Sequence, residues 1–189
     1  MAMQIKFTRK LLYQMCFFTL IGFSVVGYLV YTLTTGNHFS ELLIDRASIW
    51  EQILVGVGFG IGGFVIILSV SQFTVIDDSS DFLTDMLKKI NPNIHEIIFF
   101  SFCAAVGEEI LFRGAIQHWI GIWPTAILFV AVHGYLSIKN WGLTIVGIAL
   151  IFVSAGFGYL MVKFGITAAI IAHFLYDVLT FLLLKFDDD

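Results

Sequence analysis

Residues 11–35 read LLYQMCFFTLIGFSVVGYLVYTLTT, a stretch that contains no charged side chain. A helix needs about 20 predominantly apolar residues to cross a bilayer, so this stretch is long enough. It follows Lys6, Arg9 and Lys10, as the apolar part of a signal peptide would. However, it is too long for a signal peptide and has no clear small-residue cleavage site. We therefore predict an uncleaved membrane helix.

The composition of the whole chain agrees with this prediction. Of its 189 residues, 59% are hydrophobic and 13% are charged, whereas about a quarter of the residues in a soluble domain are charged. This composition excludes a water-soluble globule and a disordered chain. With 10 Lys and Arg and a net charge of −4, a general nucleic-acid surface is excluded as well. We predict an all-α, polytopic transmembrane helical bundle that forms a single domain over residues 1–189.

Further apolar stretches bring the prediction to about six spanning helices. The additional spans are Gln52–Ile76 and, approximately, Asn93–His118, Trp119–Ile138, Trp141–Val162 and Phe164–Leu184. The polar stretch Asp77–Pro92 has apolar residues at helical spacing, which predicts a short amphipathic helix at the membrane interface. Within the second span, the small-residue pairs Gly56/Gly60 and Gly58/Gly62 predict close packing against other helices.

Positive charges are distributed unevenly between the two sides of this topology. With the N-terminus inside, the cytoplasmic side receives Lys6, Arg9, Lys10, Lys88, Lys89, Lys139 and Lys185. Only Arg46 and Lys163 fall outside. Because cytoplasmic loops of membrane proteins carry an excess of Lys and Arg, we predict a multi-pass cell-membrane protein with both termini in the cytoplasm.

Six ionisable residues lie inside the otherwise apolar spans: Glu108, Glu109, Arg113, His133, His173 and Asp177. Each costs about 2.5 kcal/mol or more if it faces lipid, so each needs a partner or a water-filled cavity. Glu109 and Arg113 are four residues apart on one helix face, which predicts a buried ion pair. Glu108 points about 100° away from Glu109 around the helix, so it remains free for chemistry on another face.

His173 and Asp177 have the same four-residue spacing, so Asp177 can orient His173 or select its tautomer. Straight-helix estimates place Glu108, His133 and His173 within roughly 7 Å of the membrane midplane, on three different helices. A carboxylate there can take a proton from water while histidines donate hydrogen bonds to a developing oxyanion. A polar network with a structural role alone is the competing interpretation of these residues.

Three motifs occur in order along the chain: Glu108-Glu109-x-x-x-Arg113, Phe129-x-x-x-His133 and His173-x-x-x-Asp177. Over residues 108–177 the chain thereby resembles the CAAX protease and bacteriocin-processing family of intramembrane endopeptidases, and it looks like a bacterial member. The resemblance implies that Glu108 activates the water, while His133 and His173 stabilise the oxyanion or assist proton transfer. The family often has Asn at the position of Asp177. Because an ionised Asp cannot donate a hydrogen bond, we predict that Asp177 orients His173 or acts in its protonated form.

A glutamate and two histidines could also bind zinc, with Glu108, His133 and His173 as ligands and an open fourth position. The sequence has no H-E-x-x-H helix to set two ligands one turn apart, and the resemblance implies a water activated without metal. We therefore predict no cofactor, with zinc as the alternative.

The implied partners are the lipid bilayer and a peptide or membrane-protein substrate. Bacterial relatives are linked to bacteriocin leader processing, self-immunity and peptide signalling.

Two functions of other classes could use the same residues. A non-catalytic immunity or regulatory protein would keep the helices but would not require Glu108. A proton-coupled transporter would use the buried charges as a relay. We rank the transporter last, because the sequence has no inverted repeat and no pair of helices broken by Gly or Pro.

Overall fold

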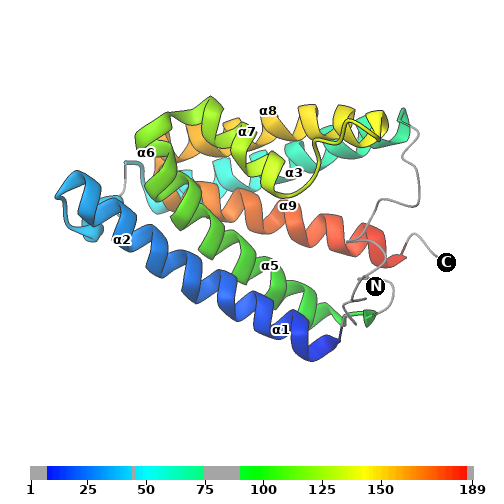
Figure 1. Ribbon diagram of the computed structural model, residues 1–189, viewed down its shortest axis with the longest axis horizontal. Coiled ribbons are helices and arrows are strands. Elements are labelled where there is room, and N and C mark those ends of the chain that lie inside the picture. Colours follow the sequence, from blue (N-terminus) through cyan, green and yellow to red (C-terminus); the bar gives the residue numbers. More distant parts are fainter. Residues whose placement is uncertain (1–7, 44–45, 75–89, 187–189) are drawn as a thin grey trace.

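The computed structural model describes residues 8–43, 46–74 and 90–186, which form helices joined by turns, with no strand among them. The predicted all-α class is confirmed (Figure 1). Most of the predicted amphipathic helix Asp77–Pro92 lies outside the described residues. The elements are α1 (Arg9–Phe17), η1 (Phe18–Phe23), α2 (Ser24–Thr35), η2 (Phe39–Leu43), α3 (Ile49–Gln72), α5 (Ile94–Glu109), η4 (Ile110–Ile116), α6 (Gln117–Ile120), α7 (Ile122–Val132), α8 (Trp141–Phe164) and α9 (Ile166–Phe186).

Four helices in the described part of the chain are long and apolar enough to cross a membrane, which indicates a multi-pass membrane protein. They are α3, α8, α9 and the continuous helix Arg9–Thr35, which comprises α1, η1 and α2. Each coincides with a predicted span, and their ends differ from the predicted ones by at most four residues. The start of α3 is earlier than predicted because Ser48 and Glu51 form a capping box before the apolar residues begin.

The third predicted span along the chain, Asn93–His118, corresponds to a continuous helix from Ile94 to Ile120 that comprises α5, η4 and α6. It is not among the four apolar candidates, because Glu108, Glu109 and Arg113 all lie near its middle. Its length and its charged residues together make it a helix that carries polar groups into the bundle.

The fourth predicted span, Trp119–Ile138, is wrong as a single spanning helix, because its central part is helical only over Ile122–Val132. Gly121 precedes α7 with φ of +81°, and Gly134 follows it with φ of +82°. Glycine adopts these left-handed conformations without a steric penalty, and they terminate helices. His133 therefore lies at the C-terminal end of a short helix rather than in the middle of a long one.

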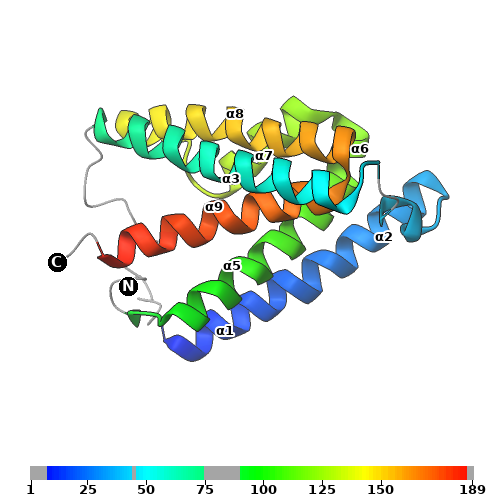
Figure 2. The ribbon, with the colours of Figure 1, turned by 180° about the vertical axis from the view of Figure 1, so that it is seen from behind.

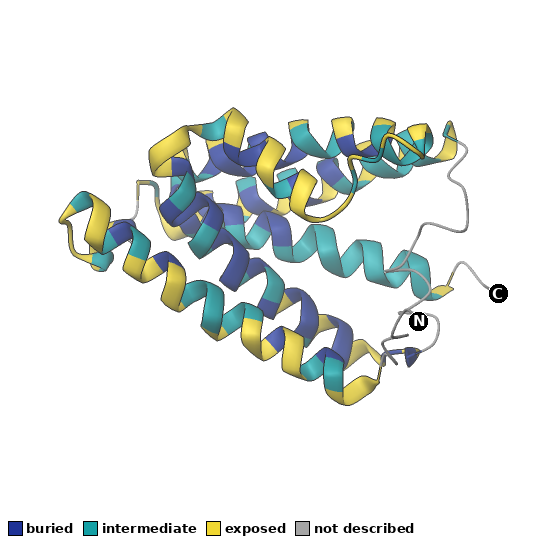
Figure 3. Ribbon diagram, in the orientation of Figure 1, coloured by how far each residue is buried: buried dark blue, intermediate teal, exposed yellow. Residues whose placement is uncertain are grey.

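Helix α9 is the central helix of the bundle. It contacts α3, α5 and α8, and it runs between the pair formed by α3 and α8 and the group formed by α1, α2 and α5 (Figures 1 and 2). The outer faces of α1 and α2 are largely exposed (Figure 3), and large apolar side chains such as Leu33 (81%) and Leu54 (71%) are exposed in the isolated chain. Such faces suit contact with lipid.

Small residues allow close contacts with α9. A Cβ atom on Gly56 or Gly60 would collide with the carbonyl oxygen of Ala168 or Ala172, respectively. The predicted packing role of Gly56 and Gly60 is therefore confirmed. The same prediction for Gly58 and Gly62 is wrong, because no described atom outside their own helix lies within 4 Å of a Cβ placed on either.

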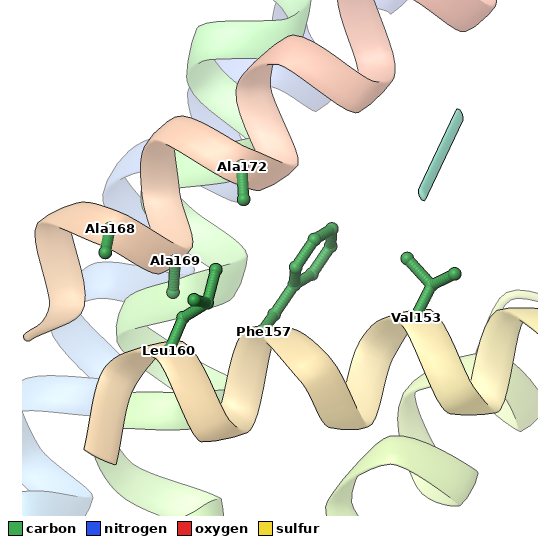
Figure 4. Packing of buried hydrophobic residues seen from close by; sticks show 6 residues of the cluster. All are labelled: Val153, Phe157, Leu160, Ala168, Ala169 and Ala172. Carbon is green, nitrogen blue, oxygen red and sulfur yellow. The ribbon is translucent and has the colours of Figure 1, made fainter. Parts of the chain in front are cut away.

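On its other side α9 packs against α8 through a small apolar cluster (Figure 4). Three alanines of α9 leave room for larger side chains that rise from α8. The buried members of the cluster are Val153, Phe157, Leu160, Ala168, Ala169 and Ala172. This contact sets the distance between α8 and the residues of α9 that follow Ala172.

Two π-helical segments mark the contact between the first helix and α5. η1 packs against α5, and η4 packs against α2. The backbones approach closely, because a Cβ on Gly107 would collide with the Thr19 carbonyl group and one on Gly27 with the Ile110 carbonyl group. π-helical turns are rare and occur frequently at functional sites. Here η4 begins directly after Glu109 and contains Arg113.

Candidate active site

The two adjacent glutamates at the end of α5 have different surroundings. The Glu108 side chain lines a cavity of about 330 Å³ between α1, α5, α7, α8 and α9. Glu109 is fully buried, at 0% exposure, and does not line this cavity. Neighbouring side chains on a helix point about 100° apart, which explains why one carboxylate reaches the cavity and the other is enclosed by protein.

Both predicted histidines present their Nε2 atoms to Glu108. The Glu108 Oε2 atom lies 3.5 Å from His133 Nε2 and 4.0 Å from His173 Nε2. The Nδ1 atom of His133 lies 2.6 Å from the Phe129 carbonyl oxygen. Because a carbonyl oxygen can only accept, His133 Nδ1 is the donor in this bond, and Nε2 is the nitrogen left for the cavity.

Glu109 contacts two partners at once. Its Oε1 atom accepts a hydrogen bond of 2.8 Å from His173 Nδ1, and its Oε2 atom lies 3.3 Å from Arg113 Nε. The Glu109 and Arg113 side chains are 0% and 1% exposed. A buried charge without its partner is strongly destabilising, so each of the two needs the other. As a consequence, His173 is held with Nδ1 protonated and with Nε2 facing the cavity.

Asp177 lies beside the cavity edge of His173, with its Oδ2 atom 3.6 Å from Nε2. This distance is too long for a hydrogen bond. It is within the range of an ion pair, so the orienting role of Asp177 stays a prediction, and the hydrogen bond from His173 Nδ1 is accepted by Glu109. The reason is geometric: Nδ1 faces α5, whereas Asp177 is one turn further along α9 and reaches only the opposite edge of the ring.

The Glu109–His173 hydrogen bond is a contact of the candidate site that the sequence did not reveal. The two residues are 64 positions apart and lie on different helices. The four-residue spacing rule assigned Glu109 to Arg113 and His173 to Asp177, because it relates only residues of one helix. No spacing in the sequence could have paired Glu109 with His173.

Apart from its acidic and histidine side chains, the cavity has mostly apolar walls. Five helices and the turn after α7 contribute to them, including Leu12, Met15, Phe100, Leu150, Val153 and Phe181. An apolar cavity with a few convergent polar groups is the usual form of a small-molecule or substrate site. The site can therefore hold a water molecule beside Glu108 and the reacting group of an apolar substrate next to two imidazoles.

The alternative zinc ligands, Glu108, His133 and His173, meet in this cavity. Within residues 8–43, 46–74 and 90–186, no group of three or more His, Cys, Asp and Glu side chains has an arrangement that could hold a metal ion. The prediction of a metal-free reaction rests on the sequence, and chelation of bound metal would test it.

Comparison with known proteins gives two matches. Residues 90–179, which include all three motifs, match the family described as type II CAAX prenyl endopeptidase Rce1-like. The chain is also 31% identical over 122 residues to the uncharacterized protein YpbD of Bacillus subtilis (strain 168), an alignment that covers 62% of this chain and 64% of that protein. The chain thus spans less than two thirds of the length of this relative. No solved structure matches the chain.

Proposed function

Because residues 90–179 belong to the Rce1-like type II CAAX prenyl endopeptidase family, which is a family of proteases, we propose that this chain is an intramembrane endopeptidase with Glu108 as its general base. One observation supports this assignment above the others. Of two neighbouring buried carboxylates, Glu109 is engaged by Arg113 and His173, whereas Glu108 opens into a cavity and faces two imidazole Nε2 atoms.

The proposed reaction begins with a water molecule beside Glu108. Its oxygen bonds to the carbonyl carbon of the scissile peptide while Glu108 takes a proton from it. His133 and His173 then donate hydrogen bonds to the resulting oxyanion. Glu108 passes the proton to the leaving nitrogen, the C–N bond breaks, and the products are a carboxylic acid and an amine. Because both Nδ1 atoms are engaged, each histidine must carry a proton on Nε2 to donate into the cavity.

The substrate that suits this cavity is a peptide with apolar side chains near the scissile bond, since the walls offer mainly apolar contacts. Peptide or bacteriocin processing and self-immunity are the biological roles that the resemblance implies. A non-catalytic immunity protein with the same helices would not depend on the carboxylate of Glu108, which makes that residue the means of separating the two functions.

The direct test uses the purified full-length chain in liposomes, incubated with a library of apolar peptides and analysed by mass spectrometry for cleavage products. The parent chain is compared with Glu108→Gln, which keeps the side-chain shape but cannot accept the proton. Glu41→Gln, an exposed glutamate outside this cavity, is the matched control. Products from the parent and the control but not from Glu108→Gln support the proposal, whereas equal cleavage by all three contradicts it.

Chelation tests the proposed metal-free reaction. We expect activity to survive exhaustive dialysis against a strong chelator, and purified protein to contain no stoichiometric zinc by elemental analysis. A carboxylate-activated water needs no Lewis acid, whereas a zinc-bound water would be lost with the metal. Loss of activity with specific rescue by zinc would assign Glu108, His133 and His173 as ligands instead.

We also propose that the chain crosses the membrane six times, with both termini in the cytoplasm; the fourth crossing is made by the short helix α7 together with the residues that follow it, in place of the predicted helix Trp119–Ile138. In support, α1 begins and α9 ends at the same end of the bundle (Figures 1 and 2), where Lys185 Nζ donates to the Asn91 side chain and Arg9 donates to the Ile90 carbonyl oxygen. Reporters fused after Asp189 and inserted in the Gly36–Glu51 loop are expected to report the cytoplasmic and external sides, respectively. If both report one side, the number of crossings is wrong.

A further inference from the structure

Helix α8 carries none of the three motifs, yet one of its faces adjoins the candidate active site. Ser154 and Phe157 are three residues apart and therefore lie on the same side of α8. Both are buried and both line the cavity, with exposures of 4% and 3%. Ser154 contacts Arg113, and Phe157 contacts His173.

Ser154 holds the guanidinium group of Arg113 in place. The Arg113 Nη2 atom donates to the Ser154 hydroxyl at 2.8 Å and to the Ser154 carbonyl oxygen at 3.2 Å. Nε faces Glu109, and Nη1 has no hydrogen-bond partner in the described part of the chain. Among the described residues, the hydrogen bonds of this guanidinium group go to Ser154, so Ser154 fixes the position from which Arg113 meets Glu109.

Phe157 contacts His173 directly, whereas Ser154 reaches His173 through Arg113 and Glu109. Its ring rises from α8 toward α9, near Ala172 (Figure 4), and it stacks on the His173 imidazole at 5.5 Å with an angle of 19° between the rings. The Arg113 guanidinium carbon lies 5.8 Å from the Phe157 ring centre and 4.6 Å from that of Phe129. The ring thus limits rotation of His173 from one side.

We propose that Ser154 and Phe157 are positioning residues of the active site, which act on His173 through Arg113 and Glu109 and through ring stacking. Only the predicted effect of these residues on turnover rests on the proposed function. Ser154 orients Arg113, Arg113 orients Glu109, and Glu109 holds Nδ1 of His173, so that Nε2 points at the reacting carbonyl group. Phe157 keeps the imidazole plane close to parallel with its own, at an angle of 19°.

The first test observes His173 without any substrate. We label the histidines of the full-length chain with ¹⁵N, assign His173 by its loss in His173→Gln, and record the protonation of its two ring nitrogens by NMR in detergent micelles. The parent should show His173 with Nδ1 protonated, and Ser154→Ala should show a mixture of states at the same pH. Ser154→Thr, which keeps the hydroxyl group, should restore the parent signal.

Ser101→Ala is the matched control, because Ser101 is a fully buried serine of α5 that does not line the cavity. It should leave the His173 signal unchanged. Ser154→Ala is expected to fold, because the backbone carbonyl oxygen still accepts from Arg113. An unchanged His173 signal in folded Ser154→Ala, or an equal change in Ser101→Ala, overturns the proposal whether or not the chain is a protease.

The second test measures turnover of a peptide that the parent cleaves. Ser154→Ala and Phe157→Leu should each lower kcat about tenfold with KM unchanged, since a hydrogen bond to a charged group and the orientation it provides act in the transition state. Phe157→Tyr, which keeps the ring, should retain most activity. In a His173→Ala background, Ser154→Ala should cause no further loss.

These outcomes separate the positioning proposal from the proposed function. If Glu108→Gln is inactive while Ser154→Ala and Phe157→Leu match the parent, the protease function stands and the positioning role is overturned. A rise in KM with unchanged kcat would also overturn it, because it would assign α8 to substrate binding. If Glu108→Gln is as active as the parent, the proposed function falls and the NMR result alone decides the positioning role.

Discussion

Glu108→Gln, His133→Ala and His173→Ala are each expected to lose most peptide hydrolysis while the protein remains folded. Gln keeps the shape of Glu108 but cannot take the proton from water, so no nucleophile forms. Loss of one preorganised oxyanion donor typically costs about 10²–10³-fold in turnover, which is the loss expected for each histidine. The measurement is kcat for a cleaved peptide, with folding checked by thermal unfolding in the same detergent.

The three losses should also be strongly non-additive, since residues that act as one catalytic unit fail together. A His133→Ala/His173→Ala double variant should therefore lose little more than the more severe single variant. Losses that multiply would indicate that the two histidines act independently, for example one on the oxyanion and one on substrate binding. Parent-like activity of Glu108→Gln would favour the non-catalytic immunity or regulatory function instead.

Glu109→Gln and Arg113→Ala are expected to reduce stability more than any variant at the cavity. Each removes one member of an ion pair whose side chains are 0% and 1% exposed, and stranding the other charge typically costs about 3–5 kcal/mol. Glu109→Gln also removes the carboxylate that accepts from His173 Nδ1. The measurement is the midpoint of thermal unfolding and the yield of folded protein in detergent.

Two controls and one double variant sharpen this prediction. Glu41→Gln and Lys163→Ala change exposed charges and should shift the unfolding midpoint little, because the interactions of exposed charges contribute little to stability. The double variant Glu109→Met/Arg113→Met removes both charges and should recover much of the lost stability. This double variant should not cleave peptide, because His173 has lost its hydrogen-bond acceptor. Normal stability of both single variants would contradict the ion pair.

The membrane-helix class follows from the sequence because it depends on local composition. Stretches such as residues 11–35 and 52–76 have no charge over a length that spans a bilayer, and any fold must place them in an apolar environment. The same local reasoning failed for Trp119–Ile138. Hydropathy alone does not report that Gly121 and Gly134 adopt φ values of +81° and +82°, which end the helix on both sides.

The sequence by itself determined which residues are candidates for the chemistry and how they pair along one helix. The 3.6-residue period relates Glu109 to Arg113 and His173 to Asp177, because both members of each pair are attached to the same rigid backbone. The different directions of Glu108 and Glu109, about 100° apart around the helix, follow from the same period. The similar depth of Glu108, His133 and His173 in the membrane led us to expect that they converge. In the structure, Glu108 Oε2 lies 3.5 Å from His133 Nε2 and 4.0 Å from His173 Nε2.

Only the tertiary structure decided how the helices meet. It joined Glu109 to His173 across 64 positions, shifted the contact of Asp177 to the opposite edge of the ring, and brought Ser154 and Phe157 of α8 to Arg113 and His173. These contacts depend on how closely α5, α8 and α9 approach, which is set by small residues such as Ala172 and by the side chains packed against them. A sequence period describes one helix, whereas contacts between helices arise only when all side chains at the interface pack together.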